Sequence, residues 1–296
     1  MYGLALLVAA CQTSPSSRVL PQPSAPTTDV STASPPLPSG PPSVSAPDAP
    51  VPAAEERRAW PPPEPAGAVS DFCIDEVSVL DESTCYVLPE TPTRELIVYL
   101  HGIVPPGKTS PQKTKFETVV RNAARRANVA ALIPRGRRGL APKGRESYWG
   151  WPTAADAHAR FSRELVAEFA EKRRKLEALT GVAFERVYFA GSSAGAYFVA
   201  HLALRGDVVA DGFGAMSGGA LPAQVDFAGL ARAPFYVGYG RHDTVAGSAR
   251  ALAQRLEREG WPVRLAVHPL AHGAQEIYLD EAFAFFREQA QARREP

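Results

Sequence analysis

The sequence predicts an α/β fold, in which a mostly parallel sheet is covered by helices on both faces. Short apolar segments rich in β-branched residues alternate along the chain with longer segments of helical periodicity. This alternation is typical of parallel strands joined by crossover helices. The short segments are largely apolar and lack regular polar alternation, which indicates strands that are buried on both sides. The chain shows no internal repeat, so one sheet without repeated units is expected.

Each expected strand is a short apolar run, and each expected helix carries apolar residues at intervals of three and four. The strands comprise residues 95–100, 129–133, 187–190, 211–216, 234–239 and 263–267. The helices comprise residues 111–127, 154–179, 196–205, 247–259 and 277–290. In the first helix, Phe116, Val120 and Ala124 share one face. A hairpin of two short strands, turning at residues 81–83, precedes them.

The composition bounds the domains and the partners. The 296 residues are 45% hydrophobic and 21% charged, with a formal net charge of +1, so the charge gives no support for a nucleic-acid partner. Of the 29 prolines, 16 lie before residue 66. Residues 12–67 are rich in Pro, Ser, Ala and Thr and are expected to form a disordered tether. Residues 68–296 are expected to form a single catalytic domain.

The first 11 residues resemble the signal segment of a bacterial lipoprotein. Residues 4–10 are apolar, and the sequence Val8-Ala9-Ala10-Cys11 resembles a lipobox, in which the cysteine is acylated after cleavage. The run is too short to span a bilayer, and no Lys or Arg precedes it. The resemblance implies an exported protein, periplasmic or on the outer surface, whose lipidated Cys11 anchors it to a membrane. The alternative is an apolar start that arose by chance.

The other two cysteines, Cys73 and Cys85, are expected to form a disulfide. They flank the predicted hairpin, where facing positions would bring the two sulfurs within bonding distance. An exported protein would hold such a pair oxidised. The alternative is a pair of buried free thiols in a cytosolic protein. No metal site is expected, because neither a histidine nor a third cysteine lies nearby in the sequence.

One motif predicts the chemistry of the chain. Residues Gly191-Ser192-Ser193-Ala194-Gly195 fit the pattern G-x-S-x-G between a predicted strand and a predicted helix. A serine on such a sharp turn is a nucleophile elbow, and Ser193 stands at its third position. The alternative is a Gly/Ser turn that is kept for packing.

Two further residues follow later strands. Asp243 follows the strand at 234–239, and His272 follows the last strand. Catalytic groups in open α/β sheets gather at the carboxyl ends of strands, and the order Ser, Asp, His is that of α/β-hydrolases. Residues 72–293 resemble a compact serine esterase of this superfamily, of the feruloyl esterase, polyhydroxybutyrate depolymerase or carboxylesterase type.

The resemblance implies a role for each residue. Ser193 would be the nucleophile, His272 its base and Asp243 the orienting acid. The oxyanion donors would be the backbone N–H groups of Ala194 and Ile103. The wider His-Gly-Gly-Gly motif of the family is replaced by His101-Gly102-Ile103.

Other residues compete for some of these roles. His268 competes with His272 for the role of base, and Asp207 and Asp226 compete with Asp243 for that of the acid. We expect His101 to serve the structure of the oxyanion loop.

The surroundings of the site predict less. Trp149, Trp151, Ser192 and Met216 are candidates for the substrate pocket, although the two tryptophans fit core packing equally well. The loop at 134–145 holds five cationic residues, which would recognise an anionic group or simply be solvated. The connection between the strands ending at residues 216 and 239 is too short for a large lid.

The sequence thus predicts a monomeric serine esterase that acts on small ester substrates and needs no cofactor. A serine peptidase or amidase, an acyltransferase and a non-catalytic binding protein on the same fold are the alternatives.

Overall fold

The structure is a computed structural model, which describes residue 60, residues 70–107 and residues 109–294. The predicted signal segment, Cys11 and the predicted tether, apart from residue 60, lie outside the described residues. The description below concerns the unit that begins at Ala54.

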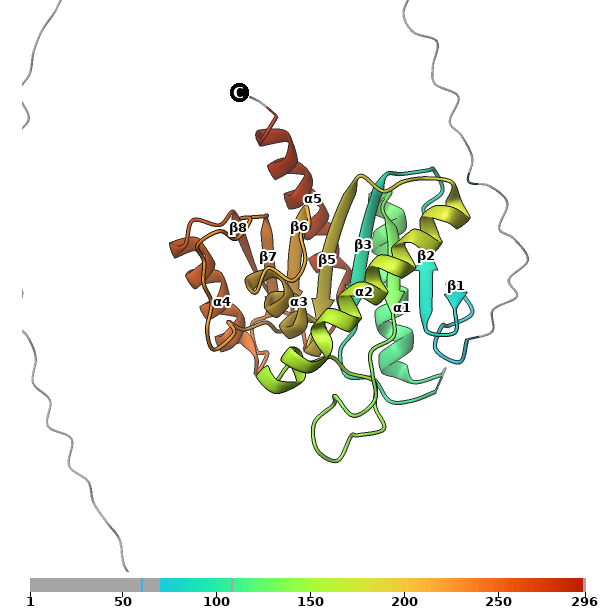
Figure 1. Ribbon diagram of the computed structural model, residues 1–296, viewed down its shortest axis with the longest axis horizontal. Helices are drawn as coiled ribbons and strands as arrows, with labels where there is room; N and C mark the ends of the chain where they lie inside the picture. Colours follow the sequence, from blue (N-terminus) through green and yellow to red (C-terminus); the bar gives the residue numbers. More distant parts are fainter. Residues whose placement is uncertain (1–59, 61–69, 108, 295–296) are drawn as a thin grey trace, which may run out of the picture. The chain divides into compact units, whose positions relative to one another are not determined.

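The described strands form a single eight-stranded sheet (Figure 1). They are β1 (Ser78–Asp81), β2 (Thr84–Val87), β3 (Glu95–Leu100), β4 (Ala130–Pro134), β5 (Arg186–Ser192), β6 (Gly212–Met216), β7 (Phe235–Gly240) and β8 (Val263–His268). Their order in the sheet is β1-β2-β4-β3-β5-β6-β7-β8. The strands from β4 to β8 in this order pair in parallel, whereas β1, β2 and β4 pair antiparallel.

The part of the chain that the structure describes contains five helices, which cover the sheet. They are α1 (Pro111–Ala127), α2 (Ala155–Thr180), α3 (Ala194–Leu204), α4 (Ala246–Arg258) and α5 (Glu276–Ala292). One apolar cluster holds the buried residues of α2, α3 and α4, and a second holds those of α1 and α5. Figure 1 shows α2 and α3 together on the near face of the sheet. The predicted layer of helices on each face is therefore confirmed.

The central strands explain why two cores form. In β3, Leu96 and Val98 belong to one cluster, and Ile97 and Tyr99 belong to the other. Side chains alternate across a strand, so an uninterrupted apolar run serves both faces at once. All six residues of β3 are buried. This is the physical reason for the lack of polar alternation in the sequence.

The disulfide Cys73–Cys85 is present, with 5.6 Å between the two Cα atoms. The predicted hairpin is present as well, since β1 and β2 pair antiparallel around a turn at residues 82–83, but the predicted facing positions of the two cysteines were wrong. Cys85 lies on β2 opposite Val79 of β1, and Cys73 lies in the segment before β1. The disulfide therefore fastens the chain that enters the hairpin, and it does not link facing positions of the two strands.

Two features are absent from the described residues, a membrane-spanning helix and a cluster of metal-binding side chains. None of the helices described here is long and apolar enough to cross a bilayer. No group of three or more His, Cys, Asp or Glu side chains able to hold a metal ion occurs in the same part of the chain.

Candidate active site

Ser193 lies on the tight turn between β5 and α3. Its backbone has φ 53° and ψ −121°, a conformation that is rare for a residue with a side chain. Its N–H donates to the carbonyl of Met216 on the neighbouring strand, at 3.0 Å. Backbone strain of this kind is stored at functional sites when the surroundings hold it in place.

The two glycines of the motif are required by the packing of this turn. A Cβ atom on Gly195 would lie 2.0 Å from the carbonyl oxygen of Leu100 in β3. A Cβ atom on Gly191 would lie 2.6 Å from the backbone of Gly195. Strand, turn and helix approach so closely that only glycine fits at either position, which explains the G-x-S-x-G spacing.

Asp243 lies in the turn after β7 and before α4. Its side chain is fully buried, and Oδ1 accepts a hydrogen bond from the N–H of Val245 at 3.1 Å. Both carboxylate oxygens contact Nδ1 of His272, at 3.0 and 2.9 Å. A carboxylate can only accept, so Nδ1 carries the proton that it donates to Asp243.

His272 links the carboxylate to the serine. Its Nε2 lies 3.0 Å from Oγ of Ser193, although the two residues are 79 positions apart. With Nδ1 protonated, a neutral imidazole has an acceptor at Nε2, which can take a hydrogen bond from the serine hydroxyl. His272 is 45% exposed while Asp243 is buried. The imidazole of His272 therefore faces solvent, whereas the carboxylate of Asp243 is shielded from solvent.

The structure assigns the competing residues elsewhere. His268 contacts Glu281 of α5 at 3.1 Å. Asp226 accepts from the N–H of Ala228 within its own loop, and Asp207 lies 3.4 Å from His158. Of the candidates weighed, Ser193, Asp243 and His272 are brought together.

The sequence did not indicate a role for Ser217. This buried residue follows β6 with φ 46°, and its Oγ donates to the carbonyl of Gly273 at 3.1 Å. Gly273 follows His272 directly and has φ 118°. Ser217 thus anchors the loop that carries the histidine. The only signal in the sequence was the place of Ser217 at the end of a strand beside β5.

Residues 101–104, which we call the oxyanion loop, lie against the serine. A Cβ atom on Gly102 would lie 3.3 Å from Cβ and 3.9 Å from Oγ of Ser193. The half-buried Ile103 is the next residue, and Ala194 is the first residue of α3. The predicted donors therefore come from the two segments that flank the hydroxyl, one of them a helix N-terminus.

His101 is fully buried at the start of this loop. Its Nε2 accepts a hydrogen bond from the N–H of Gly136 at 2.9 Å, and Nδ1 contacts the carbonyl of Gly102. The pKa of His101 is lowered to about 4, mainly by burial and also by the charge of Lys113, while the contact with the carbonyl of Gly102 opposes the change. The ring is therefore neutral near pH 7 and joins the oxyanion loop to the loop after β4.

Two members of the predicted pocket are removed from it by burial. Met216 is fully buried in the core on the α1 and α5 side, and only its backbone serves the site. Trp151 is also fully buried; its indole N–H donates to the carbonyl of His101 at 2.8 Å. The core packing foreseen as an alternative describes this tryptophan. Ser192 is buried in β5.

Trp149 remains beside the site. It is half-buried, and its backbone pairs with Val104 of the oxyanion loop. The guanidinium groups of Arg135 and Arg138 lie 4.3 and 4.5 Å from the centre of its ring. Arg137 is occupied elsewhere, because it pairs with Glu164 and Glu168 of α2. The cationic loop is thus partly neutralised by its own neighbours.

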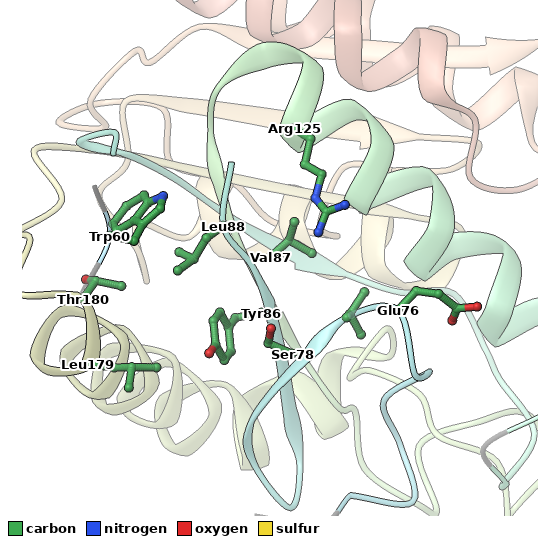
Figure 2. Close-up of a pocket in the computed structure, with 10 residues that line it drawn as sticks. Trp60, Glu76, Ser78, Tyr86, Val87, Leu88, Arg125, Leu179 and Thr180 are labelled. Atoms are coloured by element: carbon green, nitrogen blue, oxygen red, sulfur yellow. The ribbon is translucent and has the colours of Figure 1, made fainter. Parts of the chain in front are cut away.

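A cavity of about 210 Å³ is lined by residues other than those predicted for the site, and Figure 2 shows this lining. Its lining comes from β2, the start of β1, the C-terminal turns of α1 and α2, and Trp60. The indole of Trp60 donates to the carbonyl of Pro89 at 2.7 Å. The cavity contains none of the predicted site residues.

Comparison with solved structures identifies the fold. Esterase PE8 has a TM-score of 0.51 and 20% sequence identity, with 70% of this chain and 98% of that chain covered. The carboxylesterase of Bacillus cereus has a TM-score of 0.51 and 14% identity, with coverage of 69% and 93%. The chain has the α/β-hydrolase fold. The predicted fold is confirmed, and residues 217–234, between β6 and β7, form neither helix nor strand.

A third structure of this fold is Arabidopsis thaliana SOBER1, with a TM-score of 0.50, 16% identity and coverage of 67% and 100%. Comparison of the chain with protein-family models finds no match, and comparison with curated protein sequences finds none either. Similarity at this level of identity establishes the α/β-hydrolase fold alone, and function has to be argued from the site.

Proposed function

We propose that this protein is a serine hydrolase that cleaves carboxylic esters through an acyl-enzyme intermediate. The observation that carries the proposal is the hydrogen-bonded series Asp243, His272, Ser193, with contacts of 2.9 and 3.0 Å. It ends in a serine held at positive φ on a strand-to-helix turn. The names of two neighbours, an esterase and a carboxylesterase, support the choice of esters.

The geometry gives each group a task. Oγ of Ser193 attacks the ester carbonyl while Nε2 of His272 takes its proton. The buried carboxylate of Asp243 holds the imidazole in the required tautomer and stabilises the imidazolium that forms. The backbone N–H groups of Ile103 and Ala194 donate to the oxyanion. His272 then protonates the departing alcohol. In the second stage a water molecule attacks the acyl-enzyme while Nε2 of His272 takes its proton, and His272 returns that proton to Oγ of Ser193 as the acid is released.

Labelling with a fluorophosphonate probe tests this proposal. The wild-type protein should be labelled, and Ser193→Ala should not be, because the probe phosphonylates an activated serine hydroxyl. Hydrolysis of p-nitrophenyl acetate by Ser193→Ala should fall by about 10⁴-fold or more. The matched control is Ser162→Ala, which removes a buried hydroxyl from α2 and should keep both signals. A folded wild-type protein that takes no label would point to a binding protein.

Two further assays separate ester hydrolysis from acyl transfer and from amide hydrolysis. Product analysis with water in competition with an added alcohol or amine distinguishes an esterase from an acyltransferase. Parallel assays of ester and anilide substrates with one acyl group distinguish an esterase from an amidase. We expect hydrolysis of the ester to dominate, since residues 217–234, between β6 and β7, form no helix that could shield the serine from water.

We also propose that the protein is exported and carries lipid on Cys11. The disulfide Cys73–Cys85 supports export, because such bonds persist in oxidising compartments. Cys11→Ala should move the protein from the membrane fraction to the soluble fraction. Recovery of the wild-type protein in the soluble fraction would contradict lipidation.

A further inference from the structure

The oxyanion loop is held from behind by an aromatic cluster. The buried ring of His101 lies 5.6 Å from Phe72, 5.3 Å from Phe116 and 5.1 Å from Trp151. Phe116 belongs to α1 and Trp151 to the loop after β4. Phe72 instead comes from the segment before β1, which we call the entry segment (residues 70–74). One wall of the pocket around His101 is therefore supplied by a segment that is not part of the sheet.

The entry segment is fixed at several points. Cys73 is bonded to Cys85 of β2. The N–H of Ile74 donates to Oε2 of Glu117 at 3.1 Å, and the carbonyl of Phe72 accepts from Nζ of Lys113. Phe72 and Cys73 are 1% exposed, so these contacts are made in the interior.

Two of these partners are buried charges on α1, the helix that follows the oxyanion loop. Lys113 and Glu117 are fully buried, and Nζ lies 4.0 Å from Oε2. Burial of a charge is costly unless the charge is paired and hydrogen-bonded. The backbone of the entry segment supplies a bond to each charge, and the ring of Phe72 lies 5.3 Å from Nζ of Lys113. These requirements define one position for Phe72 relative to α1.

We propose that Phe72 is a positioning residue for the oxyanion loop, acting through His101, and that Lys113 and the disulfide Cys73–Cys85 hold Phe72 in register. This inference rests on the proposed function, in which the oxyanion loop supplies a donor to the transition state. Oxyanion donors must lie about 2.7–3.1 Å from the position that the oxyanion will occupy. If Phe72 withdraws, His101 gains space, and its bond to Gly136 no longer fixes the loop.

The test compares two substitutions of equal size in the same apolar cluster. Phe72→Leu removes the ring that faces His101. Phe283→Leu, the control, removes an equally buried ring of α5, whose ring neighbour is Tyr188 at 6.4 Å. Both variants lose similar packing, so a difference in turnover between them reports position and not stability. The fraction folded is checked by thermal unfolding before each assay.

We expect kcat of Phe72→Leu for p-nitrophenyl acetate to fall about tenfold, with KM within about twofold of the wild-type value. This is part of the roughly 100- to 1,000-fold loss that removal of an oxyanion donor causes. Phe283→Leu should keep kcat within about twofold. The double variant Cys73→Ala/Cys85→Ala should resemble Phe72→Leu, because it releases the entry segment. Equal kcat values for Phe72→Leu and Phe283→Leu would overturn the inference.

Amide hydrogen exchange gives a readout that does not depend on catalysis. In Phe72→Leu, the N–H of Gly136 and the peptide spanning residues 101–104 should exchange at least about tenfold faster, while α5 is unchanged. In Phe283→Leu, the oxyanion loop should keep its protection. Absence of fluorophosphonate labelling on the wild-type protein would refute the proposed function. Unchanged exchange in Phe72→Leu would refute the positioning role, whatever the labelling shows.

Discussion

At the level of single residues, the candidate site could be predicted because its residues follow predicted strands. Ser193, Asp243 and His272 were each chosen because they follow a predicted strand, and the structure places them in hydrogen-bond contact. Ser217 was missed because its hydroxyl bonds to a backbone carbonyl 56 positions away. A contact to backbone leaves no trace in the type of the partner residue.

The same limit explains the outcome for the predicted pocket. Met216 is the last residue of β6 and Trp151 lies in the loop after β4, yet the side chains of both are fully buried. Residue type and sequence position do not tell which way a side chain turns at the end of a strand. Only the packing of Trp151 against Phe198, with 5.8 Å between the ring centres, decides that it belongs to the core.

Asp243→Asn tests the acid at this scale. The amide keeps the size of the side chain, but only its oxygen accepts a hydrogen bond, and its NH2 group donates. An NH2 group facing Nδ1 of His272 would stabilise the tautomer with the proton on Nε2, which cannot accept the proton of Ser193. We expect kcat to fall by about 10⁴-fold, the loss that this change causes in a Ser-His-Asp protease. Asp226→Asn, which alters a loop carboxylate bonded to Ala228, should keep activity. A normal kcat for Asp243→Asn would reject the assigned role.

At the scale of elements, the apolar pattern gave the strands and helices because it reports burial directly. The helix 111–127 was predicted with both ends correct. In the structure, Pro111 stands in its first turn and Asn128 ends it in the left-handed conformation. The hairpin around residues 81–83 was also predicted, but the placement of Cys73 opposite Cys85 was wrong, because β1 begins only at Ser78 and has a bulge between Val79 and Asp81. Neither feature is visible within the hairpin sequence.

Two glycine substitutions test the packing of the elbow. In Gly195→Ala, the new methyl group would meet the carbonyl of Leu100 at 2.0 Å, so α3 must move away from β3. We expect a loss of more than about 3 kcal/mol of unfolding free energy, or failure to fold. Gly247→Ala, in the first turn of α4, meets nothing within 4 Å and should stabilise by up to about 1 kcal/mol. Urea denaturation measures both, and similar effects would contradict the geometry.

At the scale of the whole molecule, the sequence predicted the class of the sheet but not the order of its strands. β4 lies between β2 and β3, so the chain crosses over instead of pairing neighbours in sequence. A strand with a continuous apolar run, such as residues 96–100 of β3, packs equally well at any central position, and its pattern therefore does not specify its neighbours. What the pattern did specify is that the parallel strands end at a common edge, and this was enough to gather the site.

The whole molecule also determines how stability changes with pH. Burial lowers the pKa of His101, His158 and His201 to about 4, with Lys113 repelling the first and Arg205 the other two. An unfolded chain binds these protons near pH 6.5, whereas the folded protein does so only near pH 4. Above pH 6.5 these histidines therefore do not reduce the unfolding free energy. As the pH falls from 6.5 to 4, the unfolded chain binds protons that the folded protein does not bind, and the unfolding free energy decreases. The loss is about 1.4 kcal/mol per pH unit for each histidine.

Urea denaturation at pH 7.0, 6.0 and 5.0 measures this loss. His201→Gln removes one of the three buried histidines, so the dependence of the unfolding free energy on pH should become shallower by about one third. His242→Gln, which replaces an exposed histidine beside Asp243, serves as the control for a histidine that lies outside the two cores. The three imidazoles are neutral because the two cores exclude water from both faces of the sheet. An unfolding free energy that stays constant between pH 7.0 and 5.0 would mean that water reaches these rings.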